Sequence, residues 1–169
     1  MGKKSTKEDK NIYQLAREEA GLTRAEAAEA MEFVSESRIE KIESGAAQAQ
    51  PEDIMAMEKA YKKPSLSNYY CSNECPIGRV TVPEVKAGTL SEIVLELLNG
   101  INSVNKTKDR LVEITYDGEI DDTELKDFAA VKEQLEELSM TVDALQLWVD
   151  EAITSGTIDP AKLEKSSMK

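Results

Sequence analysis

The stretch of residues 22–45 constrains the fold most, because it encodes two short helices with almost no linker between them. Thr23 precedes Glu26 by three residues, which is the spacing of a capping box at a helix start. Ser35 is a second N-cap candidate, and Gly45 suits a helix C-cap because glycine adopts a left-handed conformation at little steric cost. Two helices joined by a three-residue turn cross steeply, so the stretch predicts a helix-turn-helix unit.

Apolar residues at helical spacing support both helices of this pair. Ala27, Ala28 and Met31 give the first helix one small apolar face, and the alanines would allow close approach. Ile39 and Ile42 repeat at i, i+3 in the second helix. Each helix therefore has a side that can be buried in a common core.

The residues that define this pattern occur in a characteristic order: Gly21, Leu22, Thr23, Ala27, Val34, Ser35, Ile39, Ile42, Glu43, Gly45 and Pro51. In this order and spacing, about residues 11–61 resemble the Cro and phage-repressor type of helix-turn-helix protein, the XRE family. The resemblance implies a five-helix bundle whose second helix of the pair, the recognition helix, lies in the DNA major groove. It also implies a transcriptional regulator, with repression by occlusion of a promoter.

The resemblance further implies a DNA-binding site on this pair of helices. One residue would contact a phosphate, four would lie at the start of the recognition helix, and one would lie a turn further on. In that order they are Arg24, then Ser35, Glu36, Ser37 and Arg38, then Lys41. Serine hydrogen-bonds several bases, arginine reads guanine bidentately and glutamate accepts from cytosine N4.

The charge of the chain keeps a second interpretation open. Between Arg24 and Glu43 there are three basic and six acidic residues, and the whole chain carries a net charge of −12. Residues 1–63 hold 11 basic and 13 acidic residues, so most of the negative charge lies in residues 64–169. Phosphate contacts supply most non-specific DNA affinity. The alternative is therefore an acidic helical adaptor that uses the helix-turn-helix fold to bind a protein instead of DNA.

The remainder of the N-terminal part fits a compact helical domain over residues 11–71. Ile12 and Leu15 start a first helix, Pro51 opens a fourth, and residues 65–70 form a short fifth. Before this domain, residues 1–10 carry four lysines and are expected to be a disordered basic arm, either solvated or in contact with phosphates. After it, residues 72–88 contain helix breakers and are expected to be a linker.

The C-terminal part predicts a coiled-coil-like hairpin of two long helices over residues 89–155. Apolar residues recur at spacings of three and four over about 89–115, and Asp117-Gly118 is a turn signal. Asp121 or Asp122 can cap a second helix, which carries a heptad seam from Leu135 onward. Residues 156–169 are expected to be a disordered tail. The fold class is all-α, with aromatic residues making up only 5% of the chain.

A lone hairpin cannot bury both of its apolar seams. Two hairpins from two chains would form a four-helix bundle, which predicts a homodimer through residues 89–153. The other arrangement open to the sequence is a monomer whose hairpin folds back onto the N-terminal domain. The acidic hairpin could also bind a protein effector.

Cys71 and Cys75 are the remaining candidate site. Reduced thiols, a metal that bridges two chains and redox sensing are all compatible with this pair, although a structural zinc usually takes four ligands. The chain has no histidine, which excludes Ser-His-Asp, Cys-His and His-ligated metal chemistry. No enzymatic activity and no cofactor are expected.

Two further features predict a cytoplasmic regulator whose partner is double-stranded DNA. The charged N-terminus lacks the apolar core of a signal peptide. No apolar run approaches the roughly 20 residues that a membrane span needs.

Overall fold

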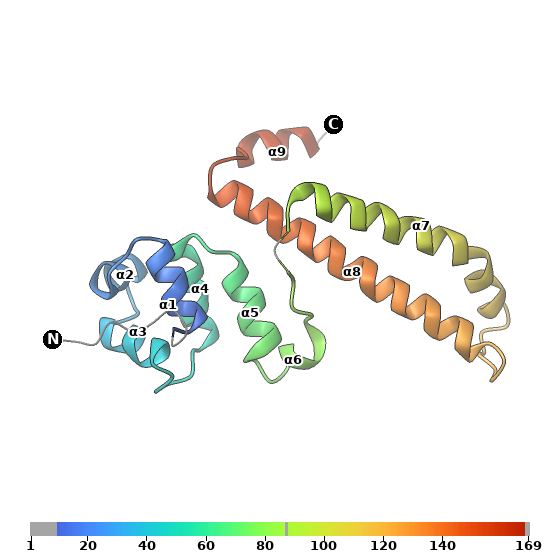
Figure 1. Ribbon diagram of the computed structural model, residues 1–169, viewed down its shortest axis with the longest axis horizontal. Helices are drawn as coiled ribbons and strands as arrows, with labels where there is room; N and C mark the ends of the chain where they lie inside the picture. Colours follow the sequence, from blue (N-terminus) through green and yellow to red (C-terminus); the bar gives the residue numbers. More distant parts are fainter. Residues whose placement is uncertain (1–9, 87, 168–169) are drawn as a thin grey trace. The chain divides into compact units, whose positions relative to one another are not determined.

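The computed structural model describes residues 10–86 and 88–167. Most of these residues are in helices and none is in a strand, so the all-α prediction is confirmed (Figure 1). They divide into two compact units, an N-terminal unit of residues 10–84 with residues 150–167, and a hairpin unit, Val85–Val149. No described helix combines the length and the apolar character needed to cross a lipid bilayer.

Five helices build the N-terminal domain, as the resemblance implies. They are α1 (Ile12–Glu19), α2 (Arg24–Met31), α3 (Glu36–Glu43), α4 (Pro51–Tyr61) and α5 (Ser65–Asn73). Helices α2 and α3 are the predicted helix-turn-helix pair, and each also contacts a further helix of the domain, α2 packing on α4 and α3 on α1.

Local signals at the helix ends hold as predicted. The Thr23 hydroxyl accepts from the Glu26 N–H at 3.2 Å, and the Glu26 carboxylate accepts from the Thr23 N–H at 2.7 Å. The Ser35 hydroxyl accepts from the Arg38 N–H at 3.2 Å at the start of α3. Gly45, with φ +73°, directly follows the C-cap of α3, so the chain leaves the helix in a conformation that favours glycine.

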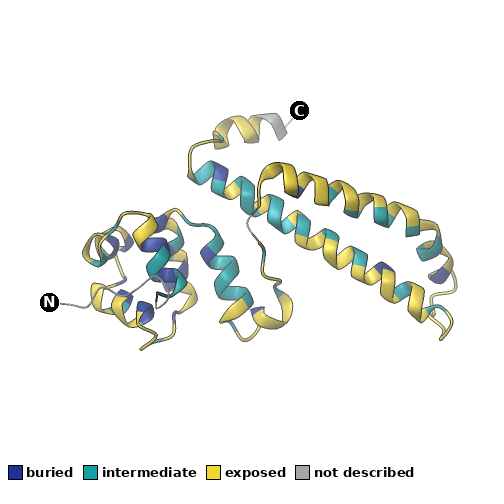
Figure 2. Ribbon diagram, viewed as in Figure 1, coloured by how far each residue is buried: buried dark blue, intermediate teal, exposed yellow. Residues whose placement is uncertain are grey.

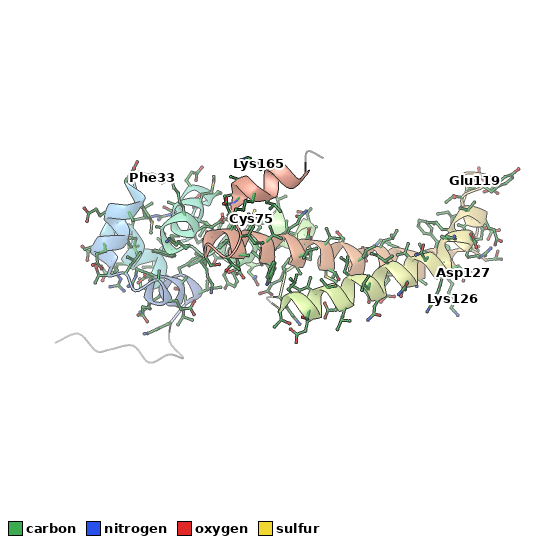
Figure 3. The ribbon with its side chains drawn as sticks, turned by 90° about the horizontal axis from the view of Figure 1, so that it is seen from above. Phe33, Cys75, Glu119, Lys126, Asp127 and Lys165 are labelled. Atoms are coloured by element: carbon green, nitrogen blue, oxygen red, sulfur yellow. The ribbon has the colours of Figure 1, made fainter. Side chains whose placement is uncertain are left out.

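The turn between α2 and α3 is strained. Glu32 has φ +60° and ψ −46°, and the Phe33 N–H donates to the Met31 carbonyl at 2.6 Å, which closes a γ-turn of the rare positive-φ type. Phe33 is 69% exposed and points outward (Figure 3). Val34, the next residue, is buried in the core. The turn therefore places two adjacent apolar side chains in opposite environments.

The helices of the N-terminal domain pack around an apolar core (Figure 2). Its buried members come from all five helices and two connecting segments: Tyr13, Ala16, Ala27, Met31, Val34, Ile39, Ile42, Ala49, Ile54, Met57, Tyr61 and Leu66. The predicted apolar residues Ala27, Met31, Ile39 and Ile42 all belong to it. Burial of these side chains on one side of α3 leaves its other side facing outward.

The segment expected to be a linker, residues 72–88, is partly helical. Helix α5 extends to Asn73, and a short helix α6 (Gly78–Thr81) follows. A Cβ atom built on Gly78 would lie 2.1 Å from the Cys71 carbonyl oxygen. Only glycine therefore allows the backbone of α6 to approach α5 this closely.

The hairpin unit consists mainly of two long helices that lie side by side, α7 (Leu90–Ile114) and α8 (Leu125–Thr154) (Figure 1). A capping box of Thr89 and Glu92 starts α7. The Asp121 carboxylate accepts from the Glu124 N–H at 3.1 Å just before α8, as the predicted cap requires. A Cβ atom on Gly100 would lie 3.1 Å from Leu138 Cδ1, so the two helices approach closely at this level.

The C-terminus differs from the sequence-based expectation. Residues 156–169 are expected to be a disordered tail, but helix α9 occupies Pro160–Ser167. The Asp159 carboxylate accepts from the Ala161 N–H at 3.0 Å, and Pro160 is the first residue of the helix. Asp followed by Pro is a helix start signal, since proline fits the first helical position.

Candidate nucleic-acid interface

The outer side of α3 carries polar residues that are exposed. Four of the six predicted DNA-binding residues are exposed: Ser35 at the N-cap of α3, and Glu36, Ser37 and Lys41 within the helix. Ile39, Ile42 and Glu43 lie on the opposite, buried side of the helix. The α-helical period thus separates a core-facing side of α3 from one that faces solvent.

Arg24 is held beside α3 by a buried carboxylate. Its Nε lies 2.8 Å from Oε2 of Glu43, whose side chain is only 1% exposed. Arg17 binds the same carboxylate through two bonds, Nε to Oε1 at 2.6 Å and Nη2 to Oε2 at 3.0 Å. The hydrogen bond to Glu43 raises the pKa of Arg17. Arg24 also lies near an exposed carboxylate, with Nη1 at 3.7 Å from Oε1 of Glu40.

Arg38 is engaged within its own chain. Its Nη2 donates to Oδ2 of Asp53 at 2.6 Å and to the Gln48 carbonyl at 2.8 Å, and its Nε lies 3.2 Å from Oδ2 of Asp53. Asp53 also accepts from the Gln50 N–H at 2.9 Å. The hydrogen bond to Asp53 raises the pKa of Arg38. The side chain predicted to read a base therefore ties the loop after α3 to the start of α4.

Lys41 is the exposed cation on this side of α3, and within residues 10–86 and 88–167 the structure gives it no ion pair. Glu36 and Glu40, one turn apart on α3, are exposed as well. The surface is thus mixed in sign, with two arginines paired inside the chain and one lysine facing outward.

Arg17 and Asp53 also shape this surface, although no sequence motif singles them out. Arg17 lies at i, i+4 from Tyr13 on the buried side of α1, a place where a charged residue needs a partner. Asp53 is the third residue of α4, near the positive end of the helix dipole. Those positions were the available signals, but neither indicates a partner 15 or 26 residues away.

Residues 1–9 of the predicted basic arm lie outside the described residues. Lys10, the last residue of the arm, pairs with Glu18 at 2.6 Å. The positive charge of Lys10 is therefore balanced by a carboxylate of α1.

Cys71 and Cys75 are free and half-buried. Cys71 lies in α5, Cys75 just beyond its end, and the Gly78 N–H lies 3.4 Å from the Cys75 sulfur. Within the parts of the chain that the structure describes, no group of three or more histidine, cysteine, aspartate or glutamate side chains is placed to hold a metal ion. The two cysteines therefore lie, half-buried, where α5 meets α6.

Comparison with known proteins agrees with the geometry of the N-terminal domain. A family model described as a helix-turn-helix domain matches residues 14–64. No curated protein and no solved structure matches the chain. The matched segment spans from α1 to the end of α4, so it includes the pair α2–α3 and the carboxylates that hold Arg24 and Arg38. The chain thus carries a helix-turn-helix domain, the kind of domain found in DNA-binding regulators.

Proposed function

We propose that the protein is a sequence-specific DNA-binding transcriptional regulator of the Cro and phage-repressor type that acts as a dimer in the cytoplasm. The observation that carries the proposal is the exposed outer side of α3 within a matched helix-turn-helix domain. In this arrangement the recognition helix enters the major groove and its first residues meet base edges. Repression by promoter occlusion is the mode that we propose.

The proposed contacts divide into two kinds. Ser35, Glu36 and Ser37 lie at the start of α3, where their side chains would meet base edges. Lys41 and Arg24 would neutralise phosphates, which position a protein without reading sequence. Arg38 would contribute indirectly, because its bonds to Asp53 and Gln48 fix the loop beside the recognition helix.

An unpartnered apolar face of the hairpin supports the dimer. Successive residues of an α-helix turn by about 100°, so residues three, four and seven apart share one stripe. The exposed apolar residues of α7 and the apolar residues of α8 that continue the face form such stripes: Leu90, Val94, Leu98 and Ile101 on α7, and Phe128, Leu135 and Val142 on α8. Because the helices are antiparallel, both stripes lie on the same side of the seam between them.

The opposite face of the hairpin is polar. By the same helical period it carries Glu96 and Arg110 of α7 and Glu137 of α8. The apolar face, in contrast, has an open hollow of about 270 Å³ lined chiefly by Leu111, Phe128, Val131 and Leu135. This difference favours the apolar face as the dimer interface. The polar face remains available to the protein effector that we propose as a further partner.

A two-fold axis along the hairpins would place the α7 stripe of one copy against the α8 stripe of the other. Both copies of α7 would then start at the same end of a four-helix bundle, so both helix-turn-helix domains could reach one duplex. Two recognition helices of such a dimer bind half-sites about 34 Å apart, one turn of DNA. The proposed operator is therefore a pseudo-palindrome.

The test is selection of duplex DNA from a random pool by the purified full chain at moderate salt. A two-fold-symmetric site whose affinity falls with Lys41→Ala supports the proposal. Lys59→Ala is the matched control, because Lys59 is an exposed lysine on α4 and not on α3. Recovery of no site, or equal affinity for every duplex, would contradict sequence-specific regulation.

The second candidate is the acidic adaptor, which one observation favours. Arg24 and Arg38 are both paired with carboxylates of their own chain, while Glu36 and Glu40 are exposed on the recognition surface. Such a surface would repel phosphates and attract a basic segment of a protein. If the protein is such an adaptor, the selection from random duplex DNA recovers no site, although light scattering shows that the chain is a dimer.

A further inference from the structure

Arg24 and Arg38 are both ion-paired, but the two pairs differ in their charge balance. Asp53 has one arginine partner, Arg38, so that pair is neutral. Glu43 has two arginine partners, and Arg17 alone already takes both of its oxygens. Arg17 and Arg24 together therefore bring two positive charges to one buried negative charge.

Glu40 supplies the charge that balances this cluster. Its carboxylate lies 3.7 Å from Nη1 of Arg24, which is too long for a hydrogen bond, and its side chain is 63% exposed. Arg24 is 34% exposed. Exposed ion pairs of this kind contribute little, because water and salt screen them. The contact between Arg24 and Glu40 is therefore easily displaced.

The donors of Arg24 are divided between the two carboxylates. Nε donates to the buried Glu43, which fixes the position of the guanidinium. No hydrogen bond from its Nη groups to any residue in the described parts of the chain accompanies the long contact with Glu40. Arg38 differs, because its Nε and Nη2 are both bonded and Asp53 and Gln48 would lose partners if it moved.

From this difference we propose that Glu40 limits DNA affinity by competing with a DNA phosphate for the guanidinium of Arg24. Glu43 is the positioning residue, since it holds Nε while the Nη groups keep their donors for another partner. The proposal rests on the DNA-binding function proposed above. It identifies Glu40 as a residue that weakens binding to all sequences alike, because a phosphate contact carries no sequence information.

The experiment measures binding of the full chain to a labelled duplex by fluorescence anisotropy at several salt concentrations. Glu40→Gln is compared with Glu36→Gln. Glu36 lies one turn before Glu40 on α3, carries the same charge and has no ion pair with Arg24 in the described parts of the chain. Glu40→Gln is expected to raise affinity about fivefold, the upper end for an exposed ion pair, and Glu36→Gln about twofold at most.

The same two substitutions are then made in an Arg24→Gln background. There the two gains are expected to be equal, because the phosphate for which Glu40 competes has lost its arginine. Arg24→Gln alone is expected to reduce the slope of log K against log salt by about 0.9, the value for one phosphate contact. Thermal unfolding checks that this variant is folded, and Arg24→Met, which keeps the aliphatic stem, replaces it if it is not.

Each outcome decides the proposal. The proposal is supported if Glu40→Gln raises affinity more than Glu36→Gln does, and if this difference is lost in the Arg24→Gln background. Equal gains from the two substitutions in the Arg24 protein, with the parent protein binding DNA, would overturn the role of Glu40 and leave the DNA-binding function intact. Failure of every variant to bind any duplex at low salt would overturn both.

Discussion

The two units of the molecule complete their cores to very different extents. In the N-terminal domain five helices enclose twelve buried apolar residues. Among the described residues of the hairpin unit, Ile93, Ile114 and Val131 are the buried apolar residues, while Leu98 and Leu135 remain 51% and 44% exposed. Five short helices that cross steeply can surround a core, whereas two helices that lie side by side contact each other along one line only. The N-terminal domain therefore encloses its core within one chain, and the incomplete core of the hairpin supports our proposal that it pairs with a second copy.

Removal of the buried carboxylate of the N-terminal domain should have the largest effect. Glu43→Gln leaves Arg17 buried without a counter-charge, so we expect the free energy of unfolding of this domain to fall by about 3–5 kcal/mol. Denaturant unfolding followed by tyrosine fluorescence measures it. Glu40→Gln, an exposed change one turn away, is the control and is expected to stay within about 0.5 kcal/mol. Similar losses in both variants would contradict the assigned role of Glu43.

Charges on the apolar face of the hairpin should separate two copies of the chain. Leu98→Asp with Leu135→Asp is expected to weaken dimerisation at least about hundredfold, or about 2.7 kcal/mol, because the carboxylates would have to be desolvated. Sedimentation equilibrium measures the constant. Asn99→Asp with Ala130→Asp adds the same charges to the opposite face and should change it little. Equal weakening by both pairs of substitutions would rule out the apolar face as the interface.

Relief of the strained turn should stabilise the N-terminal domain alone. Glu32→Gly is expected to raise its free energy of unfolding by about 0.5–1 kcal/mol, since glycine tolerates the positive φ but loses more entropy on folding. Thermal unfolding measures the gain. Glu29→Gly, in the regular part of α2, should instead lose about 1 kcal/mol. A loss at position 32 would show that the turn is not strained.

The smallest expected effect concerns the pH dependence of stability, and the two capping boxes, one in each unit, serve as controls for each other. The Thr23 N–H lowers the pKa of Glu26, and the Thr89 hydroxyl lowers the pKa of Glu92. A lowered folded-state pKa means that each carboxylate stabilises the fold above its unfolded pKa and loses this contribution as the pH falls through the folded value. Glu26→Gln and Glu92→Gln should each flatten the acid dependence of stability of one unit only. A change in both units from either substitution would contradict their independence.

Sequence could predict the parts of the fold that depend on neighbouring residues. Thr23 and Glu26 form the expected capping box because both partners lie within one turn. The apolar seams of α7 and α8 follow from helical spacing in the same way. The helix at Pro160–Ser167 was missed because its apolar content is low, although Asp159 and Pro160 signal a start.

The candidate site could be predicted in position but not in its electrostatics. Exposure of Ser37 and Lys41, which lie four residues apart, follows from the helical period of α3. The ion pair between Arg38 and Asp53 joins residues 15 apart across a loop, so no local pattern shows it. Its formation turns the predicted base-reading residue into one that fixes a loop. The sharing of Glu43 by two arginines has the same non-local origin.

The measurement that tests the central difference most directly is denaturant unfolding at several chain concentrations. Trp148, the single tryptophan, reports on α8 within the hairpin unit, and four of the five tyrosines report on the N-terminal domain. A dimer gains stability with concentration by mass action. A dimer held by the hairpin predicts that the Trp148 midpoint rises when the chain concentration increases about hundredfold, while the tyrosine midpoint stays fixed. A Trp148 midpoint that does not change with concentration would contradict it.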